Sequence, residues 1–117
     1  MMSIGTDIVQ VSRLKTAIEK NKDAFLSKIF SQEEIDYCSS YSNPPIHYAG
    51  KYAAKEAVKK ALLGNRICEH IALSDIKVLN REDKSPYIDI DSLKDIKCNI
   101  SISHDGDYAI AFAIIEK

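Results

Sequence analysis

The sequence predicts an α+β fold in which helices pack on a small antiparallel sheet. The first half of the chain places apolar side chains at helical spacing, whereas the second half contains short runs that alternate with a period of two. Asp105 and Gly106 separate the last two of these runs, as the turn of a β-hairpin would. Because most of the helical segments precede the strands instead of alternating with them, we expect an antiparallel sheet.

Composition limits the classes of protein to which the chain can belong. Its 117 residues suit one domain, residues 1–117, since a domain typically has about 100–200 residues. Sixteen Lys and Arg residues nearly balance seventeen Asp and Glu residues, which argues against a histone-like protein. No apolar run approaches the roughly 18 residues of a membrane span, and the N-terminus has no signal-peptide pattern. Three cysteines without paired spacing indicate free thiols, so we expect a cytoplasmic protein.

The first elements are a strand at residues 3–9 and an amphipathic helix that begins at Val11. The helix has an apolar stripe and is expected to break near Asn21. The stripe consists of Leu14, Ile18, Phe25 and Ile29.

Two further helices follow. Ser31 and Glu34 have the spacing of a capping box, so a short acidic helix should run to about Tyr41, before Pro44 and Pro45. The clearest helix is the Ala- and Lys-rich segment 46–63, which Gly64 and Asn65 close as a C-cap.

Strands are expected in the remainder of the chain, at residues 71–79, 87–90, 98–103 and 108–114. Residues 100–103 read Ile-Ser-Ile-Ser, the alternation of a strand with one wet face. On the last strand, Ala109, Ala111 and Ala113 alternate with Ile110, Phe112 and Ile114. We expect one of these two faces to be buried against another copy of the chain.

Two carboxylates are candidates for a functional site. Asp7 stands among apolar residues of the first strand, where a buried carboxylate needs a partner; the simpler interpretation is a strand-end residue. Glu56 lies four residues before Lys60, so the two share one helical face. The simpler interpretation of this segment is a solvated face with an ordinary Glu–Lys pair, together with Lys51, Lys55 and Lys59.

Two carboxylates far apart in sequence could share one divalent cation. Mg²⁺ typically binds one or two carboxylates, keeps several waters and completes its shell with substrate phosphates. The lysines near Glu56 would balance the remaining phosphate charge. His104 follows Ser103 and precedes Asp105, but adjacent strand residues point to opposite faces, so these three cannot form a catalytic triad.

Several motifs together resemble holo-[acyl-carrier-protein] synthase, the small bacterial family of 4'-phosphopantetheinyl transferases. The matching segments are Ile-Gly-Thr-Asp-Ile at 4–8 with Arg13, Phe-Ser-x-x-Glu-Ile at 30–35, Gly-Lys-Tyr-Ala-Ala-Lys-Glu-Ala at 50–57 with Lys60, and Ile-Ser-Ile-Ser-His at 100–104. Their order and spacing cover nearly the whole chain.

This resemblance implies that coenzyme A donates its phosphopantetheine arm to a serine of apo acyl carrier protein, releasing adenosine 3',5'-bisphosphate and supporting fatty acid biosynthesis. It assigns Mg²⁺ to Asp7 and Glu56, removal of the serine proton to a water near Glu56, and stabilisation of the pyrophosphate charge to Lys60. Lys51 and His104 match positions near the nucleotide 3'-phosphate. Arg13 matches an arginine that meets the acidic helix of the carrier protein. The family is usually a homotrimer with its active sites between subunits.

The chain departs from the family pattern in two places. Residues 63–65 read Leu-Gly-Asn, where the family usually has Gly-Thr-Gly, and Lys84 stands where it often has Gly. These differences concern the loop on the nucleotide side and the turn of a strand hairpin.

Two other functions compete with the transferase interpretation. A non-catalytic module could dock an acidic protein on the basic segment 13–28, but it would not need Asp7 and Glu56 in apolar surroundings. A Mg²⁺-dependent phosphohydrolase would need no protein partner, which leaves the basic segment unexplained. Nucleic-acid binding is disfavoured because the basic stretches lack interleaved aromatic residues. The basic segment contains Arg13, Lys15, Lys20, Lys22 and Lys28 against only Glu19 and Asp23.

Overall fold

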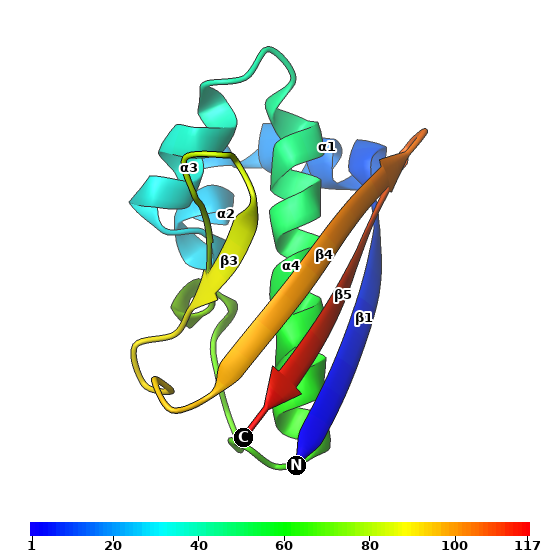
Figure 1. Cartoon of the computed structure of the whole chain (residues 1–117). Coiled ribbons are helices and arrows are strands. Elements are labelled where there is room, and N and C mark those ends of the chain that lie inside the picture. The colour runs from blue at the N-terminus through cyan, green and yellow to red at the C-terminus, as the bar shows by residue number, and fades with distance from the viewer.

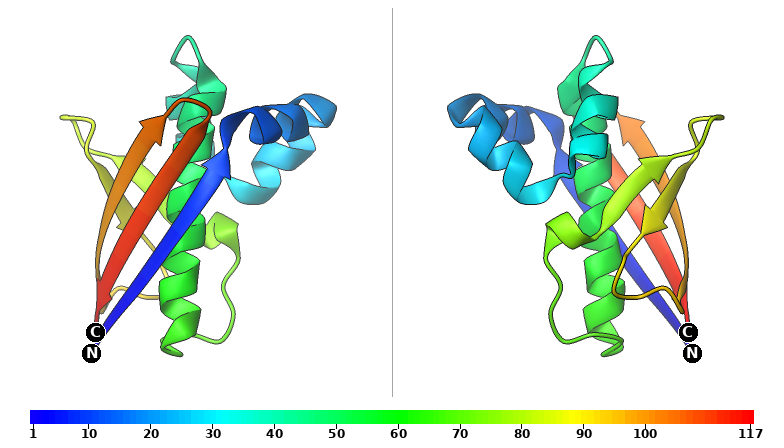
Figure 2. Two further views of the ribbon diagram at one scale, coloured as in Figure 1. Left: turned by 90° about the vertical axis from the view of Figure 1, so that its right-hand side faces the viewer. Right: turned by 90° about the vertical axis from the view of Figure 1, so that its left-hand side faces the viewer.

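One long helix packs against a twisted three-stranded sheet, and the remaining elements surround that helix (Figure 1). The computed structural model describes residues 1–117. Figure 2 shows the first two helices and a small β-hairpin on opposite sides of the long helix, with the two termini together at one end. The elements in chain order are β1 (Met2–Gln10), α1 (Val11–Lys20), α2 (Lys22–Ile29), α3 (Gln32–Ser39), α4 (Pro44–Gly64), the 3₁₀ helix η1 (Leu73–Asp75), β2 (Lys77–Asn80), β3 (Pro86–Asp89), β4 (Lys97–Asp105) and β5 (Tyr108–Glu116).

The strands form two antiparallel sheets, which confirms the predicted α+β class. The larger sheet has the order β1-β5-β4, so the first strand pairs with the last, and β2 pairs only with β3. The strand predicted at 71–79 is wrong in its first half, where Leu73–Asp75 forms η1. Here the backbone turns toward the helices, and the carbonyls of Leu73 and Ile76 accept hydrogen bonds from Lys55.

The helices form in the predicted segments, but the positions of their buried residues differ in part. The break at Asn21 is confirmed, and its non-helical backbone (φ −159°, ψ 72°) changes the helical phase between α1 and α2. As a result Leu26 is the buried residue of α2, while Phe25 and Ile29 are only half-buried. The capping box of Ser31 and Glu34 is present at the start of α3.

Helix α4 begins two residues earlier than predicted, at Pro44, because proline is tolerated in the first turn of a helix. It ends at Gly64, one residue later than predicted, with Asn65 as the C-cap, and the residue with a left-handed backbone that follows is Arg66 (φ 55°). Although α4 is 21 residues long, neither it nor any other helix is long and apolar enough to cross a membrane.

Small residues allow α4 to approach the sheet closely. Ala57 and Ala61 of α4 are fully buried with Ala111 and Ala113 of β5 in one apolar cluster. Gly5 of β1 lies so close to α4 that a Cβ there would be 1.9 Å from the carbonyl oxygen of Ala57. The opposite face of the sheet is exposed and rich in large apolar side chains: Met2, Ile4, Ile8, Tyr108, Ile110 and Phe112.

The close approach of β1 predicts a strong effect of a single methyl group. We expect Gly5→Ala to lower the free energy of unfolding by about 1–3 kcal/mol or more, because the contacted atoms are backbone and cannot move aside cheaply. Urea denaturation measures this change. Gly64→Ala is the control, since no atom lies within 4 Å of its added Cβ; an equal loss of stability in both variants would contradict this prediction.

Candidate functional site

Asp7 and Glu56 line the same pocket, although 49 positions separate them in the chain. Alternate residues of β1 follow the surface of α4: the Ser3 hydroxyl donates to the Ala61 carbonyl, and Gly5 contacts Ala57. Asp7 is the next residue in this series, so its side chain points to the same side of the sheet. The close packing at Gly5 therefore brings the strand carboxylate beside the helix carboxylate.

Lys60 interacts with Asp7 and not with Glu56. Its Nζ lies 3.0 Å from Asp7 Oδ1 and also donates to the carbonyl of Thr6 at 3.0 Å. The Asp7 side chain is 17% exposed and that of Lys60 is 55% exposed. The interpretation of Glu56 and Lys60 as an ordinary helical pair is thus wrong, because β1 supplies a partner that sequence spacing does not reveal.

Tyr52 is a member of this pocket that the sequence analysis missed. It lies one turn before Glu56 on α4 and lines the pocket with both carboxylates. Burial raises the pKa of Tyr52, and the negative charges of Glu56 and Asp7 raise it further. Tyr52 stands four residues before Glu56, so the two side chains share one helical face, and this spacing could have identified Tyr52 from the sequence.

Arg13 lines the pocket as well, because α1 follows β1 without a loop. Its side chain is exposed, as are those of the other basic residues of segment 13–28. Apolar side chains of β1, α1 and α2, among them Leu14 and Phe25, form much of the remaining wall. The pocket therefore joins two carboxylates, one guanidinium and an apolar surface.

Lys51 and His104 line a second pocket, together with His47 and Lys84. No acidic residue lines this pocket. Burial lowers the pKa of His47, and the charges of His104 and Lys51 lower it further. Because Gly50 has no side chain, the His104 ring fits against α4, where a Cβ would lie 3.0 Å from its Nε2.

The ammonium of Lys51 is partly engaged. It donates to the carbonyl of Val78 and to Asn80 Oδ1, and its side chain is buried. Two of its three N–H donors are used, and one remains.

The two departures from the family pattern have different structural outcomes. Lys84 adopts a left-handed backbone (φ 72°), the conformation that glycine prefers. Its ammonium lies 5.6 Å from the centre of the Tyr41 ring. After α4, Asn65 donates through its side chain to the carbonyl of Met2 and thus ties the helix end to β1.

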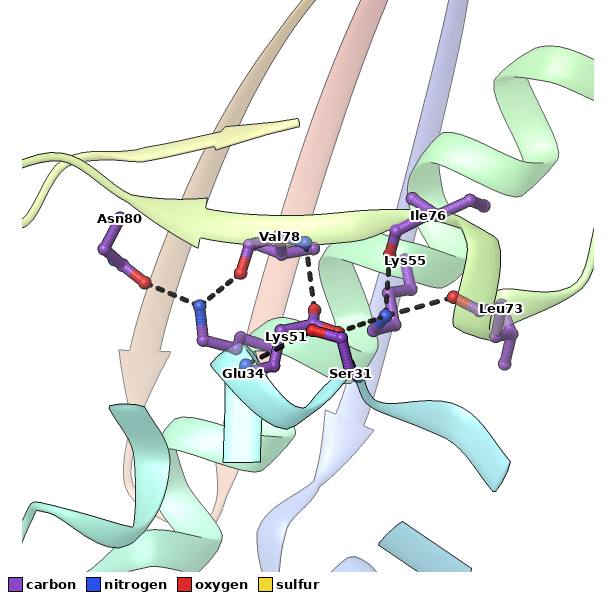
Figure 3. Close-up of polar contacts among 8 residues, drawn as sticks. All are labelled: Ser31, Glu34, Lys51, Lys55, Leu73, Ile76, Val78 and Asn80. Carbon is purple, nitrogen blue, oxygen red and sulfur yellow. Dashed lines mark hydrogen bonds and ion pairs between the residues drawn. The ribbon is translucent and has the colours of Figure 1, made fainter. Parts of the chain in front are cut away.

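A buried ion pair joins α3 and α4 (Figure 3). Lys55 Nζ lies 2.9 Å from Glu34 Oε1, and both side chains are completely buried. Burial lowers the pKa of Lys55, and Glu34 opposes that shift. The interpretation of Lys51 and Lys55 as part of a solvated face is therefore wrong. The capping box correctly placed Glu34 at the start of α3 but gave no sign of its second partner.

The same groups cover the edge of β2 that β3 leaves free. Val78 N–H donates to Glu34 Oε2, and its carbonyl accepts from Lys51. The carbonyl of Ile76 accepts from Lys55. Side chains of two helices thus replace a neighbouring strand, as Figure 3 shows along this edge.

Comparison with known proteins identifies related sequences and structures. The family model described as the 4'-phosphopantetheinyl transferase superfamily matches residues 3–113. The chain is 43% identical over 112 residues to the holo-[acyl-carrier-protein] synthase of Thermodesulfovibrio yellowstonii, with 96% of each chain covered. It is 39% identical over 118 residues to the protein of that name from Protochlamydia amoebophila, covering 97% of this chain and 96% of that one.

Solved structures with the same fold include proteins bound to coenzyme A. The Helicobacter pylori holo-[acyl-carrier-protein] synthase in complex with coenzyme A superimposes with a TM-score of 0.81 at 32% identity, covering 97% of this chain and 99% of that chain. An ACPS-CoA complex from Chronobacterium ammoniagenes gives a TM-score of 0.86 at 25% identity, covering 99% and 97%.

Proposed function

Because the chain belongs to the 4'-phosphopantetheinyl transferase superfamily, we propose how residues 1–117, as one transferase domain, carry out the transfer. The enzyme is a holo-[acyl-carrier-protein] synthase, which moves the 4'-phosphopantetheine group from coenzyme A to apo acyl carrier protein. The observation that carries the proposed mechanism is the convergence of Asp7 and Glu56 on one pocket, with Lys60 bound to Asp7.

The two carboxylates suit a magnesium ion. They offer hard oxygen donors, and no third His, Cys, Asp or Glu joins them. Mg²⁺ typically binds through one or two carboxylates and leaves its other positions to water and substrate phosphates, whereas Zn²⁺ and Ca²⁺ take more protein ligands. Asp7 and Glu56 would hold the ion, which supplies charge neutralisation for the pyrophosphate of coenzyme A when bound.

Lys60 acts on the leaving group of the reaction, and Glu56 acts on the attacking serine. The serine oxygen forms a bond to the phosphorus of the pantetheine phosphate, and the bond from that phosphorus to the oxygen of adenosine 3',5'-bisphosphate breaks. The ammonium of Lys60, already beside Asp7, stabilises the charge that develops on the departing phosphate. Glu56 orients a water that receives the serine proton.

The second pocket suits the nucleotide end of coenzyme A. Its walls carry positive or neutral polar groups from Lys51, Lys84 and two histidines. The anion that coenzyme A would place there is a phosphate. The third N–H of Lys51 and the exposed ring of His104 are the donors that we assign to the 3'-phosphate.

The exposed face of the sheet supports the proposal of a homotrimer. The alanine face of β5 packs inside the fold, so the face that carries Ile110 and Phe112 is the one left for another copy. These side chains are 45% and 43% exposed, and large apolar patches of this kind mark interaction sites. We further propose a cytoplasmic enzyme that serves fatty acid biosynthesis.

The reaction is tested with coenzyme A, Mg²⁺ and apo acyl carrier protein, followed by intact mass spectrometry. A mass gain of one phosphopantetheine group on the carrier supports transfer. Cleavage of coenzyme A without that gain indicates the phosphohydrolase, and binding of the carrier without either product indicates the docking module.

The metal carboxylates give the first mutational prediction. We expect Asp7→Asn and Glu56→Gln each to lower kcat/KM by about 100-fold or more, the size of loss seen when one charge-stabilising group is removed. Circular dichroism should show a folded protein, and EDTA should stop the wild-type enzyme. Glu69→Gln, on the exposed loop after α4, serves as the control; full activity in EDTA would exclude the Mg²⁺ mechanism.

Arg13 gives a prediction about the protein partner. The residue is exposed at the rim of the carboxylate pocket, where the acidic helix of the carrier protein must pass to deliver its serine. We expect Arg13→Glu to raise the KM for carrier protein about tenfold or more and to leave that for coenzyme A nearly unchanged, because like charges across an interface cost more than about 1.4 kcal/mol. Added salt should weaken carrier binding to the wild type, since charges are screened over about 8 Å at 0.15 M.

Lys20→Glu, at the far end of α1, is the matched charge reversal and should have a smaller effect on the KM for carrier protein. A change in the KM for coenzyme A alone would assign Arg13 to the nucleotide instead.

Assembly gives a further prediction. We expect Phe112→Asp to reduce the mass measured by light scattering to that of one chain, because a carboxylate cannot be buried in an apolar interface without a partner. Glu69→Lys, on a different surface, should keep the mass of the wild type. Wild-type protein that is already monomeric at micromolar concentration would refute the trimer.

A further inference from the structure

Helix α4 is fixed on two sides and presents its functional residues on a third. At about 100° per residue, Lys55 lies about 160° around the helix from Ala57, which contacts the sheet. Glu56 lies about 100° from each of them. A rotation of α4 about its axis would therefore move Glu56 directly toward or away from Asp7.

The sheet side of α4 has few directional contacts that could oppose such a rotation. Its apolar contacts there come from Ala53, Ala57 and Ala61, whose small side chains carry no directional bonds. The hydrogen bonds on this side lie one turn or more beyond Glu56: the Ser3 hydroxyl donates to the Ala61 carbonyl, and the exposed Lys60 ammonium donates to the strand. Directional contacts at the middle of the helix come from the opposite side, where Lys55 Nζ has three acceptors: Glu34 Oε1 at 2.9 Å, the Leu73 carbonyl at 3.0 Å and the Ile76 carbonyl at 2.6 Å. All three N–H donors of the ammonium are thus used.

Glu34 is held equally firmly. Its carboxylate accepts from Ser31 N–H at 2.8 Å, from Lys55, and from Val78 N–H at 2.9 Å. These donors belong to the start of α3, the middle of α4 and strand β2. No buried side-chain nitrogen or oxygen of the protein lacks a hydrogen-bond partner. A rotation of α4 would lengthen or break hydrogen bonds of this buried network, which is costly.

We propose that Glu34 and Lys55 are positioning residues for the transfer reaction: their buried ion pair fixes the rotation of α4 and so places Glu56 opposite Asp7. The proposal rests on the proposed metal site, because it concerns how the two carboxylates are held together. Neither residue lines the pocket of Asp7 and Glu56, so any effect on that pocket must pass through the helix.

The test uses Mn²⁺ alone as the probe of the carboxylate site, with free Mn²⁺ measured by electron paramagnetic resonance. The variants are Glu34→Gln, Lys55→Met and the double variant Glu34→Gln/Lys55→Met. The double variant leaves no unpaired buried charge and therefore keeps the test valid if a single variant fails to fold. Ile90→Ala, a truncation in the core outside the network, is the control for lost stability.

We expect the folded double variant to bind Mn²⁺ about tenfold more weakly than the wild type, at the lower end of the 10- to 100-fold loss typical when support of a metal ligand is removed. Its kcat should fall in parallel, whereas Ile90→Ala should lose stability and keep the wild-type Mn²⁺ affinity. A folded double variant with wild-type affinity would overturn the positioning role and leave the proposed function intact. Wild-type protein that binds no Mn²⁺, or binds it equally well after Asp7→Asn, would overturn the metal site and the positioning role together.

Discussion

The buried ion pair of Glu34 and Lys55 is the constraint around which the helices and the small hairpin are arranged. Removing one partner of such a pair typically costs about 3–5 kcal/mol, because a charge remains without water or a counterion. An apolar pair could fill the same space, but it would leave the N–H of Val78 and the carbonyl of Ile76 without partners. The network therefore pairs two buried charges and also supplies hydrogen-bond partners to the backbone groups at the free edge of β2.

Helix α4 transmits this constraint to the carboxylate pocket. Eleven of its 21 residues are buried, so it touches every layer of the protein and cannot shift without disturbing several contacts. On one side Gly5 lets β1 approach the helix backbone, which brings Asp7 level with Glu56. The geometry of two carboxylates thus depends on a glycine on one side of the helix and on a buried lysine on the other.

The two faces of the larger sheet differ because their neighbours differ. Alanines face α4, where only small side chains permit close packing, and large apolar side chains face outward, where nothing within one chain covers them. Charge is also divided unequally, since two carboxylates and the guanidinium of Arg13 line one pocket, whereas cationic or imidazole groups and no carboxylate line the other. This division suits a substrate with phosphates at two separate positions.

Local pattern determined the class of fold, most of the elements and the identity of the candidate residues. The capping box of Ser31, the break at Asn21 and the Asp-Gly turn depend on neighbours in the chain, so the sequence predicted them correctly. Motif resemblance supplied Asp7 and Glu56, which spacing alone could only suggest. Tertiary structure decided the partners: Lys60 binds Asp7 instead of Glu56, and the lysine at position 55 is buried instead of solvated. These contacts join residues that are 21 and 53 positions apart in the chain. The helical and strand periods relate only residues a few positions apart, so they could not predict these contacts.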